Sequence, residues 1–393
     1  MNLERLRTRL AQDVDRLRAP EGYLRAGSPR YFTLFGRDSL ISAWQTLRYD
    51  PRIAESTLRV LASYQGRRIE ARSEEEPGKI LHEHRFDPAS QKELPDWGFP
   101  YYGSVDSTLL FLIVADEYER HTADKRLATG LWPAFLAAHR WMDVHGDLDG
   151  DGFIEYERKN PHGLFHQGWK DGSADHLRIE PPVAMVEVQG YAVRAHRAFA
   201  ALAEVNDQRQ LAREARAQAT RIADALNRTF WMPDARYYAL ALDGRKRLRT
   251  AIASDPGHLP LMGVVPKDRM APLVSRLFQD DMWTPYGIRT HADSEPDFDP
   301  YGYHMGTVWP HDNWFLYRGL RATGFHREAG RVRDALLRAY EELDGIPELY
   351  AVVDDRLVDL SAGQTDGTRA NPTQAWSTGA LIDLLDEAEP TSL

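Results

Sequence analysis

The feature that most constrains the fold is a succession of helical segments that follow one another in antiparallel pairs. The first segment repeats apolar residues at three- and four-residue steps, which places them on one helix face: Leu3, Leu6, Leu10, Val14 and Leu17. With this first one, the chain has roughly eleven or twelve such segments, and the loops between them are alternately short and long. A ring of helical hairpins has tight turns at one end and long loops at the other. The sequence therefore predicts an all-α fold, an (α/α)6 barrel of six helical hairpins with small β-hairpin insertions.

The domain organisation follows from the lack of any linker. No Gly-, Ser- and Pro-rich stretch divides the chain, so we expect residues 1–393 to form a single (α/α)6 catalytic domain. One β-hairpin insertion is predicted at Asp243-Gly244, a turn between two segments of alternating polarity.

Charge and hydropathy bound the partners. Acidic residues outnumber basic ones by 59 to 49, a net charge of -10, so we expect no nucleic acid and no anionic membrane as partner. No apolar run reaches the roughly 18 residues of a membrane span, and the N-terminal segment is charged and amphipathic rather than secretory, which favours the cytoplasm. The chain has no cysteine, which excludes thiolate nucleophiles and cysteine-ligated zinc. A neutral or polar small substrate fits this composition better, and the aromatic residues described next favour a small carbohydrate. The sequence predicts no particular oligomeric state.

The long loops hold most of the aromatic and carboxylate side chains. The chain has 10 Trp and 17 Tyr, and aromatic faces beside carboxylates suit a sugar, whose ring offers C–H faces and hydroxyls. The irregular stretch 66–100 is longer than connecting loops usually are, and its aromatic residues argue against disorder. We expect it to line a pocket, with Glu83 and the nearby Asp106 as polar contacts. The alternatives are a solvated loop charge for Glu83 and a helix cap for Asp106.

The segment Gly163–His176, GLFHQGWKDGSADH, is the best candidate for the acid part of a sugar-cleaving site. Asp171 stands two residues after Trp169, and apolar neighbours raise the pKa of a carboxyl group by disfavouring its charged form. A general acid needs such a raised pKa at neutral pH. The alternative is that Asp171 and Asp175 only cap the following segment.

Arg37 and Asp38 lie at the start of a predicted helix, in YFTLFGRDSLISAWQTL. Asp38 or Ser39 is well placed to cap that helix. An Arg–Asp pair there can bind adjacent sugar hydroxyls, and a purely structural ion pair is the alternative.

The segment GDLDGDGFIEYER resembles the front of a calcium-binding loop. Asp147, Asp149 and Asp151 supply carboxylates, but Arg158 stands where an EF-hand has its bidentate Glu. A structural calcium at these three residues is therefore one prediction, and a tight turn into a short strand at residues 153–157 is the other. No cofactor is required.

Nine short blocks carry a family resemblance when taken together. They occur in this order: FGRDSLIS, GKILHE, YYGSVDST, DGDGFIEY, HQGWKDGSAD, EVQGYA, YHMGTVWPHDN, PELY and PTQAWSTGA. Over about residues 31–385 the chain resembles the catalytic domain of the glycogen debranching amylo-α-1,6-glucosidases and the related glycoside hydrolase family 63 enzymes. The resemblance implies an (α/α)6 barrel and hydrolysis with inversion of anomeric configuration.

The resemblance also implies roles for individual residues. Asp171, in the WKD block, takes the role of general acid, and Glu348, in the PEL block, takes the role of general base. Further residues are implied to line the subsite of the sugar that is removed: Arg37, Asp38, Glu83, Trp169, Trp309, His311 and Trp376. Asp106 and Gln374 are additional contacts. We therefore predict an exo-acting α-glycosidase, first of all an α-glucosidase.

The chain departs from the debranching enzymes in starting almost at the barrel, without their additional N-terminal part. A small glycoside is thus at least as well predicted as a branched polymer. Relatives built of a single barrel act on glucosylglycerate and mannosylglycerate, and hydrolysis of either is an alternative within the hydrolases.

A second class of enzyme shares the barrel. The N-acylglucosamine 2-epimerases have this fold and about this length, but they transfer protons at carbon, for which histidine is the usual residue. His166, His304 and His311 are the candidates for that chemistry. The paired carboxylates in the WKD and PEL blocks favour hydrolysis.

Overall fold

Two kinds of helix make up the computed structural model, which describes residues 3–361 and 368–386. The inner helices are buried around most of their circumference: α2 (Gly36–Gln45), α5 (Ser107–Thr122), α8 (Val186–Val205), α10 (Leu259–Met262), α12 (Pro310–Ala322) and α14 (Ala375–Asp386). The outer helices are buried on one face: α1 (Leu3–Leu17), α3 (Pro51–Ser63), α7 (Trp132–Trp141), α9 (Arg209–Thr229), α11 (Lys267–Leu277) and α13 (His326–Leu343). Shorter helical elements are α4 (Pro88–Gln91), α6 (Lys125–Gly130), the π-helical turn η1 (Met142–Gly146) and the 3₁₀ turn η2 (Asp255–His258).

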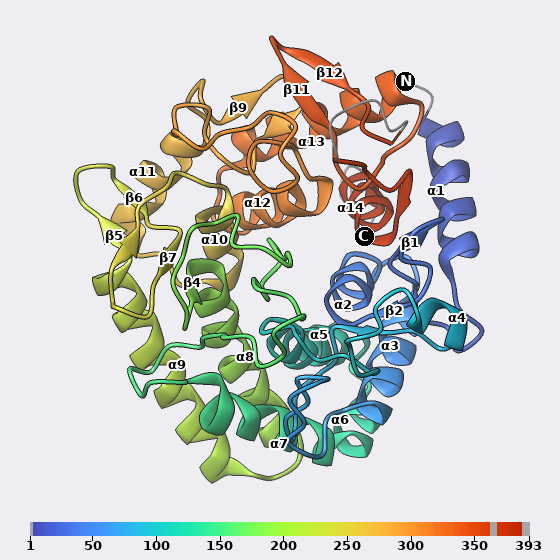
Figure 1. Cartoon of the computed structure of the whole chain (residues 1–393), viewed down its shortest axis with the longest axis vertical. Helices are drawn as coiled ribbons and strands as arrows, with labels where there is room; N and C mark the ends of the chain where they lie inside the picture. The colour runs from blue at the N-terminus through green and yellow to red at the C-terminus, as the bar shows by residue number, and fades with distance from the viewer. Residues whose placement is uncertain (1–2, 362–367, 387–393) are drawn as a thin grey trace.

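The inner helices form a closed ring. Each contacts the next in the order α2, α5, α8, α10, α12 and α14, and α14 packs against α2 again. Figure 1 shows this ring with the outer helices around it. The predicted all-α (α/α)6 barrel is confirmed.

The difference between inner and outer helices explains which of them the sequence pattern reveals. The outer helix α9 buries a stripe of Ala212, Ala215, Ala219, Ile222 and Leu226 and exposes its charged face, as a surface helix does. All ten residues of α2 are buried, polar ones included, so α2 has no such stripe. Polar side chains inside the ring need partners, and those partners form the site.

Small sheets connect the loops. The strands are β1 (Gly27–Ser28), β2 (Leu34–Phe35), β3 (Glu83–His84), β4 (Ala184–Met185), β5 (Trp231–Met232), β6 (Tyr237–Tyr238), β7 (Ala241–Leu242), β8 (Leu248–Arg249), β9 (Trp283–Thr284), β10 (Gly287–Ile288), β11 (Ala351–Val353), β12 (Arg356–Val358) and β13 (Thr373–Gln374). The hairpin predicted at Asp243-Gly244 is present as β7–β8, and β4 pairs with β7 as a third strand. β1 pairs with β13, with Gly27 opposite Gln374, and this pairing joins the N-terminal part of the chain to its C-terminal part.

Two local predictions were wrong for identifiable reasons. Residues 153–157 form a single bridge, Tyr156 to Val183, instead of a strand. Helix α2 begins at Gly36, so Asp38 lies within its first turn and caps nothing; the residue before the helix is Phe35, which has no capping side chain.

Several predicted site residues lie in the first turns of inner helices, at the end of the barrel that the long loops cover. Arg37 and Asp38 stand in the first turn of α2, His311 in that of α12 and Trp376 in that of α14. These helix N-termini carry partial positive charge, which favours carboxylates near them. No helix within residues 3–361 and 368–386 is long and apolar enough to cross a membrane.

Candidate active site

A cavity of about 280 Å³ lies beside the first residues of α2, α12 and α14. Most of the predicted site residues line it: Arg37, Asp38, Glu83, Trp169, Asp171, Trp309, Glu348, Gln374 and Trp376. They come from segments that are far apart in the chain, and the long loops before α8 and α14 supply Asp171 and Glu348. A cavity of this size suits a small ligand.

Two predicted contacts lie behind the wall of the cavity. Asp106 is fully buried and accepts a hydrogen bond from Arg37 Nε at 2.7 Å. His311 is also fully buried and stacks on Trp376, with ring centroids 3.9 Å apart and planes 12° apart. Both residues position side chains that line the cavity, and neither is among its lining residues.

The Arg37 guanidinium connects the barrel to the acid loop, the segment Gly163–His176 that holds Asp171. It is 1% exposed, and Nη1 lies 2.9 Å from Asp171 Oδ2. Its Nη2 donates to the Gln167 carbonyl oxygen at 3.2 Å and to Ser104 Oγ at 3.5 Å. With the Asp106 contact, one buried cation thus binds two carboxylates from two different loops.

Asp171 does not have the raised pKa that its Trp169 neighbour predicts. Burial by itself would raise the pKa, but the His304 ring, 3.9 Å away, and the Arg37 guanidinium outweigh burial. The pKa of Asp171 is therefore held below its ordinary value, and Asp171 is ionised in the free protein. The Arg37 partner is 134 residues away in the chain, so no local pattern reveals it.

Glu348 has the opposite shift. Burial raises its pKa to about 7, against the hydrogen bonds that it accepts. Tyr303 Oη donates to Oε1 at 2.5 Å, and the Asn371 backbone N–H donates to Oε2 at 3.0 Å. These two donors fix the orientation of the carboxyl group and favour its charged form.

Two further carboxyl groups complete the polar wall. Burial raises the pKa of Asp38 to about 8, and Asp38 Oδ1 accepts a hydrogen bond from Gln374 Nε2 at 3.0 Å. Burial also raises the pKa of Glu83, whose Oε1 binds Arg85 Nε at 2.5 Å. Glu83 is 4% exposed, so it is not the solvated loop charge of the alternative interpretation.

The aromatic wall carries polar atoms that have no protein partner. His304 stacks on Trp309, with centroids 5.0 Å and planes 14° apart, and Trp169 meets both rings edge-on. Among the described residues, no group forms a hydrogen bond with His304 Nδ1, His304 Nε2 or Trp376 Nε1. Buried polar atoms of this kind need a partner, which a sugar hydroxyl can supply.

Sequence reasoning did not single out ten of the lining residues. They are Tyr31, Phe35, His82, Arg85, Leu94, Trp97, Leu164, Ser173, Tyr303 and, as a sugar contact, His304. His82, Arg85, Leu94 and Trp97 do lie in the stretch 66–100, which was expected to line a pocket. Tyr303 and His304 belong to the block YHMGTVWPHDN, which could have been used to find them. Tyr31 has a φ of 61°, unusual for a bulky residue, and no sequence signal indicates that. His166, an epimerase candidate, binds Tyr156 and Asp175 and does not line the cavity.

The loop with the predicted calcium site contains a positive charge of its own. The Lys246 ammonium binds Asp149, Asp151 at 2.5 Å and Glu155 at 3.2 Å. Both carboxylate oxygens of Asp147 accept backbone N–H groups of the same turn. Calcium binding here stays a prediction, and the ammonium already supplies the charge that a cation would bring.

The fold and the site define a class of protein. The (α/α)6 barrel holds two buried carboxyl groups between aromatic side chains, one with a lowered pKa and one with a raised pKa. These are the elements of a glycoside hydrolase. Residues 31–357 match the mannosylglycerate hydrolase MGH1-like glycoside hydrolase domain. The chain belongs to this family of glycoside hydrolases.

Individual relatives agree with the family. A mannosylglycerate hydrolase of Rubrobacter radiotolerans is 29% identical over 199 residues, which are 49% of this chain and 42% of that protein. The matched region thus spans less than half of that relative.

Solved structures share the fold. The family 63 mannosylglycerate hydrolase of Thermus thermophilus in complex with Tris and D-glycerate has a TM-score of 0.72 at 18% identity, covering 97% of this chain and 100% of that one. The family 78 rhamnosidase of a Bacillus species has a TM-score of 0.66 at 17% identity, covering 96% of this chain and 34% of that one. None of these relatives is a debranching enzyme, so that part of the resemblance stays a prediction.

Replacing Lys246 tests the loop. We expect Lys246→Met to lower the free energy of unfolding by about 1 kcal/mol, since the ion pairs are partly exposed. Without the ammonium the carboxylates repel one another, so added Ca²⁺ is expected to raise the Tm of the variant and to leave that of the unmodified protein unchanged. Thermal unfolding with and without Ca²⁺ measures this, and the exposed Lys125→Met is the control. An equal Ca²⁺ response in both proteins would show that calcium binds beside the lysine.

Proposed function

We propose that the protein is an inverting, exo-acting α-glycosidase whose substrate is a small α-glycoside with a carboxylate on the aglycone, such as a 2-O-α-glycosyl-D-glycerate. The observation that carries the proposal is the single cavity that contains both Asp171 and Glu348, with Trp169, Trp309 and Trp376 around them. Membership of the family supports hydrolysis over the epimerase alternative.

The two carboxyl groups have complementary tasks in this proposal. Asp171 donates a proton to the glycosidic oxygen while Glu348 removes a proton from the attacking water on the opposite face of the sugar. Tyr303 and the Asn371 N–H hold the Glu348 carboxylate in one orientation, as a general base requires. The unpaired His304 nitrogens and Trp376 Nε1 are available to sugar hydroxyls.

An anionic aglycone explains how the proton reaches Asp171. In the free protein burial raises the pKa of Glu348, whereas the His304 ring and the Arg37 guanidinium hold the pKa of Asp171 below its ordinary value, so the shared proton resides on Glu348. A substrate carboxylate beside Asp171 disfavours its charged form and raises its pKa. The substrate thereby helps to protonate the acid that cleaves it.

We propose Arg30, whose Nη2 also donates to the Arg369 carbonyl oxygen, as the side chain that binds that carboxylate. Its guanidinium lies over the ring of Tyr31, 5.5 Å from the centroid, and its charge lowers the pKa of Glu348. A cavity of about 590 Å³, which Arg30 and Arg25 line, shares Tyr31 and Arg85 with the active-site cavity. An aglycone that leaves the cleavage point in this direction meets positive charge.

The glycone is the second part of the specificity. The sequence resemblance predicts glucose, whereas the relatives that are named mannosylglycerate hydrolases favour mannose. The two sugars differ only at the 2-hydroxyl, so the same panel of substrates distinguishes them.

Matched substrates test the anionic aglycone. We expect kcat/KM for 2-O-α-mannosyl- or 2-O-α-glucosyl-D-glycerate to exceed that for the corresponding glycerol glycoside by about 10- to 100-fold, the value of a hydrogen bond to a charged group. Arg30→Gln is expected to remove this preference, so that the charged and the neutral substrate react at similar rates, and Arg213→Gln on the exposed face of α9 serves as the control. Equal rates on both substrates, or a preference for isomaltose, would contradict the proposal.

Two variants separate the acid from the base. Asp171→Ala is expected to lose about 10²- to 10⁴-fold in kcat on the natural glycoside and much less on a glycosyl fluoride, whose leaving group needs no proton. Glu348→Ala is expected to lose activity on both substrates, and azide is expected to restore it by forming the β-glycosyl azide. If azide instead restored Asp171→Ala, and Glu348→Ala kept its activity on the glycosyl fluoride, the roles of acid and base would be exchanged.

The pH dependence follows from the proton that Asp171 and Glu348 share. The active form carries this proton on Asp171 and the resting form carries it on Glu348, so the fraction in the active form is constant while one proton is bound and falls as that proton is lost above a pH of about 7. Tyr303→Phe removes a donor that favours the charged form of Glu348, so we expect the basic limb of kcat/KM to move to higher pH and the plateau to fall about tenfold. An unchanged pH profile in this variant would show that Glu348 does not set the basic limb.

A further inference from the structure

A second cavity, of about 370 Å³, lies between the outer helices and shares no lining residue with the active-site cavity. Residues of α7, η1, α8 and α9 line it, together with Asp147 and Gly152 of the loop with the predicted calcium site. The catalytic proposal uses none of its residues.

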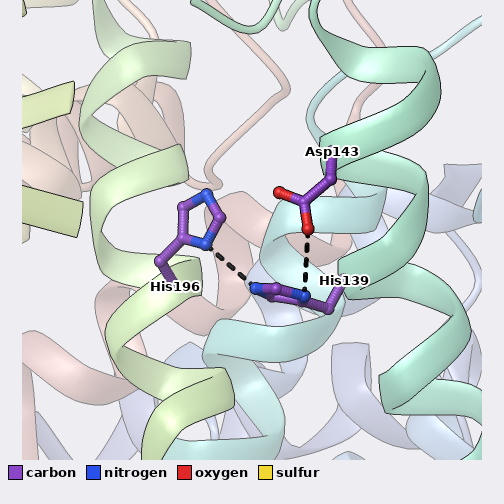
Figure 2. A group of neighbouring side chains, drawn as sticks. All are labelled: His139, Asp143 and His196. Atoms are coloured by element: carbon purple, nitrogen blue, oxygen red, sulfur yellow. Dashed lines mark hydrogen bonds and ion pairs between the residues drawn. The ribbon is translucent and has the colours of Figure 1, made fainter. Parts of the chain in front are cut away.

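Three potential metal ligands meet at this cavity. His139 comes from α7, Asp143 from η1 and His196 from α8, and one ligand atom from each lies within 4.8 Å of the others. Figure 2 shows one nitrogen of the His196 ring next to the near nitrogen of His139, with the Asp143 carboxylate next to the other nitrogen of His139; the two ring planes are 85° apart. His139 Nε2 is 3.1 Å from His196 Nδ1, and His139 Nδ1 is 3.5 Å from Asp143 Oδ2.

The His139 ring is held in one orientation. It stacks on Phe199, with ring centroids 3.8 Å and planes 16° apart, and Phe199 in turn stacks on Trp132. The Asp143 carboxylate faces His139 Nδ1 and favours a proton there, which leaves the lone pair of Nε2 directed at His196. A carboxylate behind a histidine, on the nitrogen opposite the metal, is the usual support of a metal-binding imidazole.

The separation of the two nitrogens fits two ligands of one ion. Two imidazole nitrogens at about 2.0–2.1 Å from a metal are about 2.9 Å apart at a right angle and about 3.4 Å apart at the tetrahedral angle. The observed 3.1 Å lies between these values.

We propose that His139 Nε2 and His196 Nδ1 form a site for a divalent transition metal, with Asp143 as the residue that positions His139. Imidazole ligands select Zn²⁺, Ni²⁺, Co²⁺ or Cu²⁺ over Ca²⁺ and Mg²⁺. Water from the cavity completes the coordination sphere. Binding moves the His196 proton from Nδ1 to Nε2, so the imidazole stays neutral and no net proton is released.

The position of the site indicates its effect. The ion joins the outer helix α7 to the inner helix α8, immediately before the chain leaves α7 through η1 towards the acid loop. An ion that binds only the folded protein raises its stability in proportion to the logarithm of its concentration over Kd. The site therefore stabilises this side of the barrel and takes no part in the hydrolysis.

Zn²⁺ titration of the full chain, stripped with a chelator, tests the proposal. Calorimetry is expected to show one Zn²⁺ per chain, thermal unfolding a Tm that rises with Zn²⁺, and Co²⁺ substitution a visible absorption band of nitrogen-ligated cobalt. His139→Gln and His196→Gln are each expected to weaken binding by at least about 100-fold, and Asp143→Asn by about 10- to 100-fold. His145→Gln, a histidine of the same turn that lines a different cavity, is the matched control and is expected to bind normally.

Two results would overturn the proposal. If the stripped protein binds no Zn²⁺ and no Co²⁺, the three residues are a hydrogen-bonded link between α7 and α8. If Zn²⁺ binding survives in both histidine variants, the ion binds elsewhere. Asp143 is about half exposed, so Asp143→Asn keeps the test decisive should a substitution of the buried His196 prevent folding.

Discussion

The site depends on one buried guanidinium. Arg37 stands in the first turn of the inner helix α2 and binds Asp106, before α5, and Asp171, in the loop before α8. Burying a charge costs several kcal/mol unless it is paired, so the two carboxylates and the Arg37 guanidinium hold one another in place. The same pairing sets the chemistry, because a carboxylate that binds a buried cation keeps its negative charge. The structural role of Arg37 and the ionisation of Asp171 are thus one interaction.

The barrel explains how residues so far apart in the chain form one cavity. Inner helices start at the same end of the ring, and the long loops that precede them cover that end, as the green segment between η1 and β4 does in Figure 1. The pairing of β1 with β13 brings Gln374 to Asp38 and closes the ring beside Glu348. The cavity therefore contains one carboxyl group held ionised by a cation and another held near neutrality by burial. Hydrolysis needs these two states exchanged, and a negatively charged substrate favours that exchange.

The sequence predicts the architecture well, because the rhythm of loops is a property of successive helical hairpins. It also predicts about half of the cavity lining, since the blocks around Arg37, Asp171, Glu348 and Trp376 are each local in the chain. It does not predict pairings through space. The raised pKa expected of Asp171 is wrong because the His304 ring and the Arg37 guanidinium approach it from distant parts of the chain. The prediction for Asp106 and His311 is one layer too close to the sugar, since spacing does not distinguish a lining residue from its support. Lys246, which binds Asp151 of the predicted calcium site, likewise comes from a distant part of the chain, the β7–β8 hairpin.

The measurement that tests the account most directly is proton NMR of the sugar first released from a 2-O-α-glycosyl-D-glycerate. If Asp171 protonates the leaving oxygen while Glu348 directs water to the opposite face, the β-anomer appears first and the α-anomer only as the free sugar mutarotates. Release of the α-anomer first would show retention of configuration, and it would contradict the assignment of Glu348 as the base that activates water.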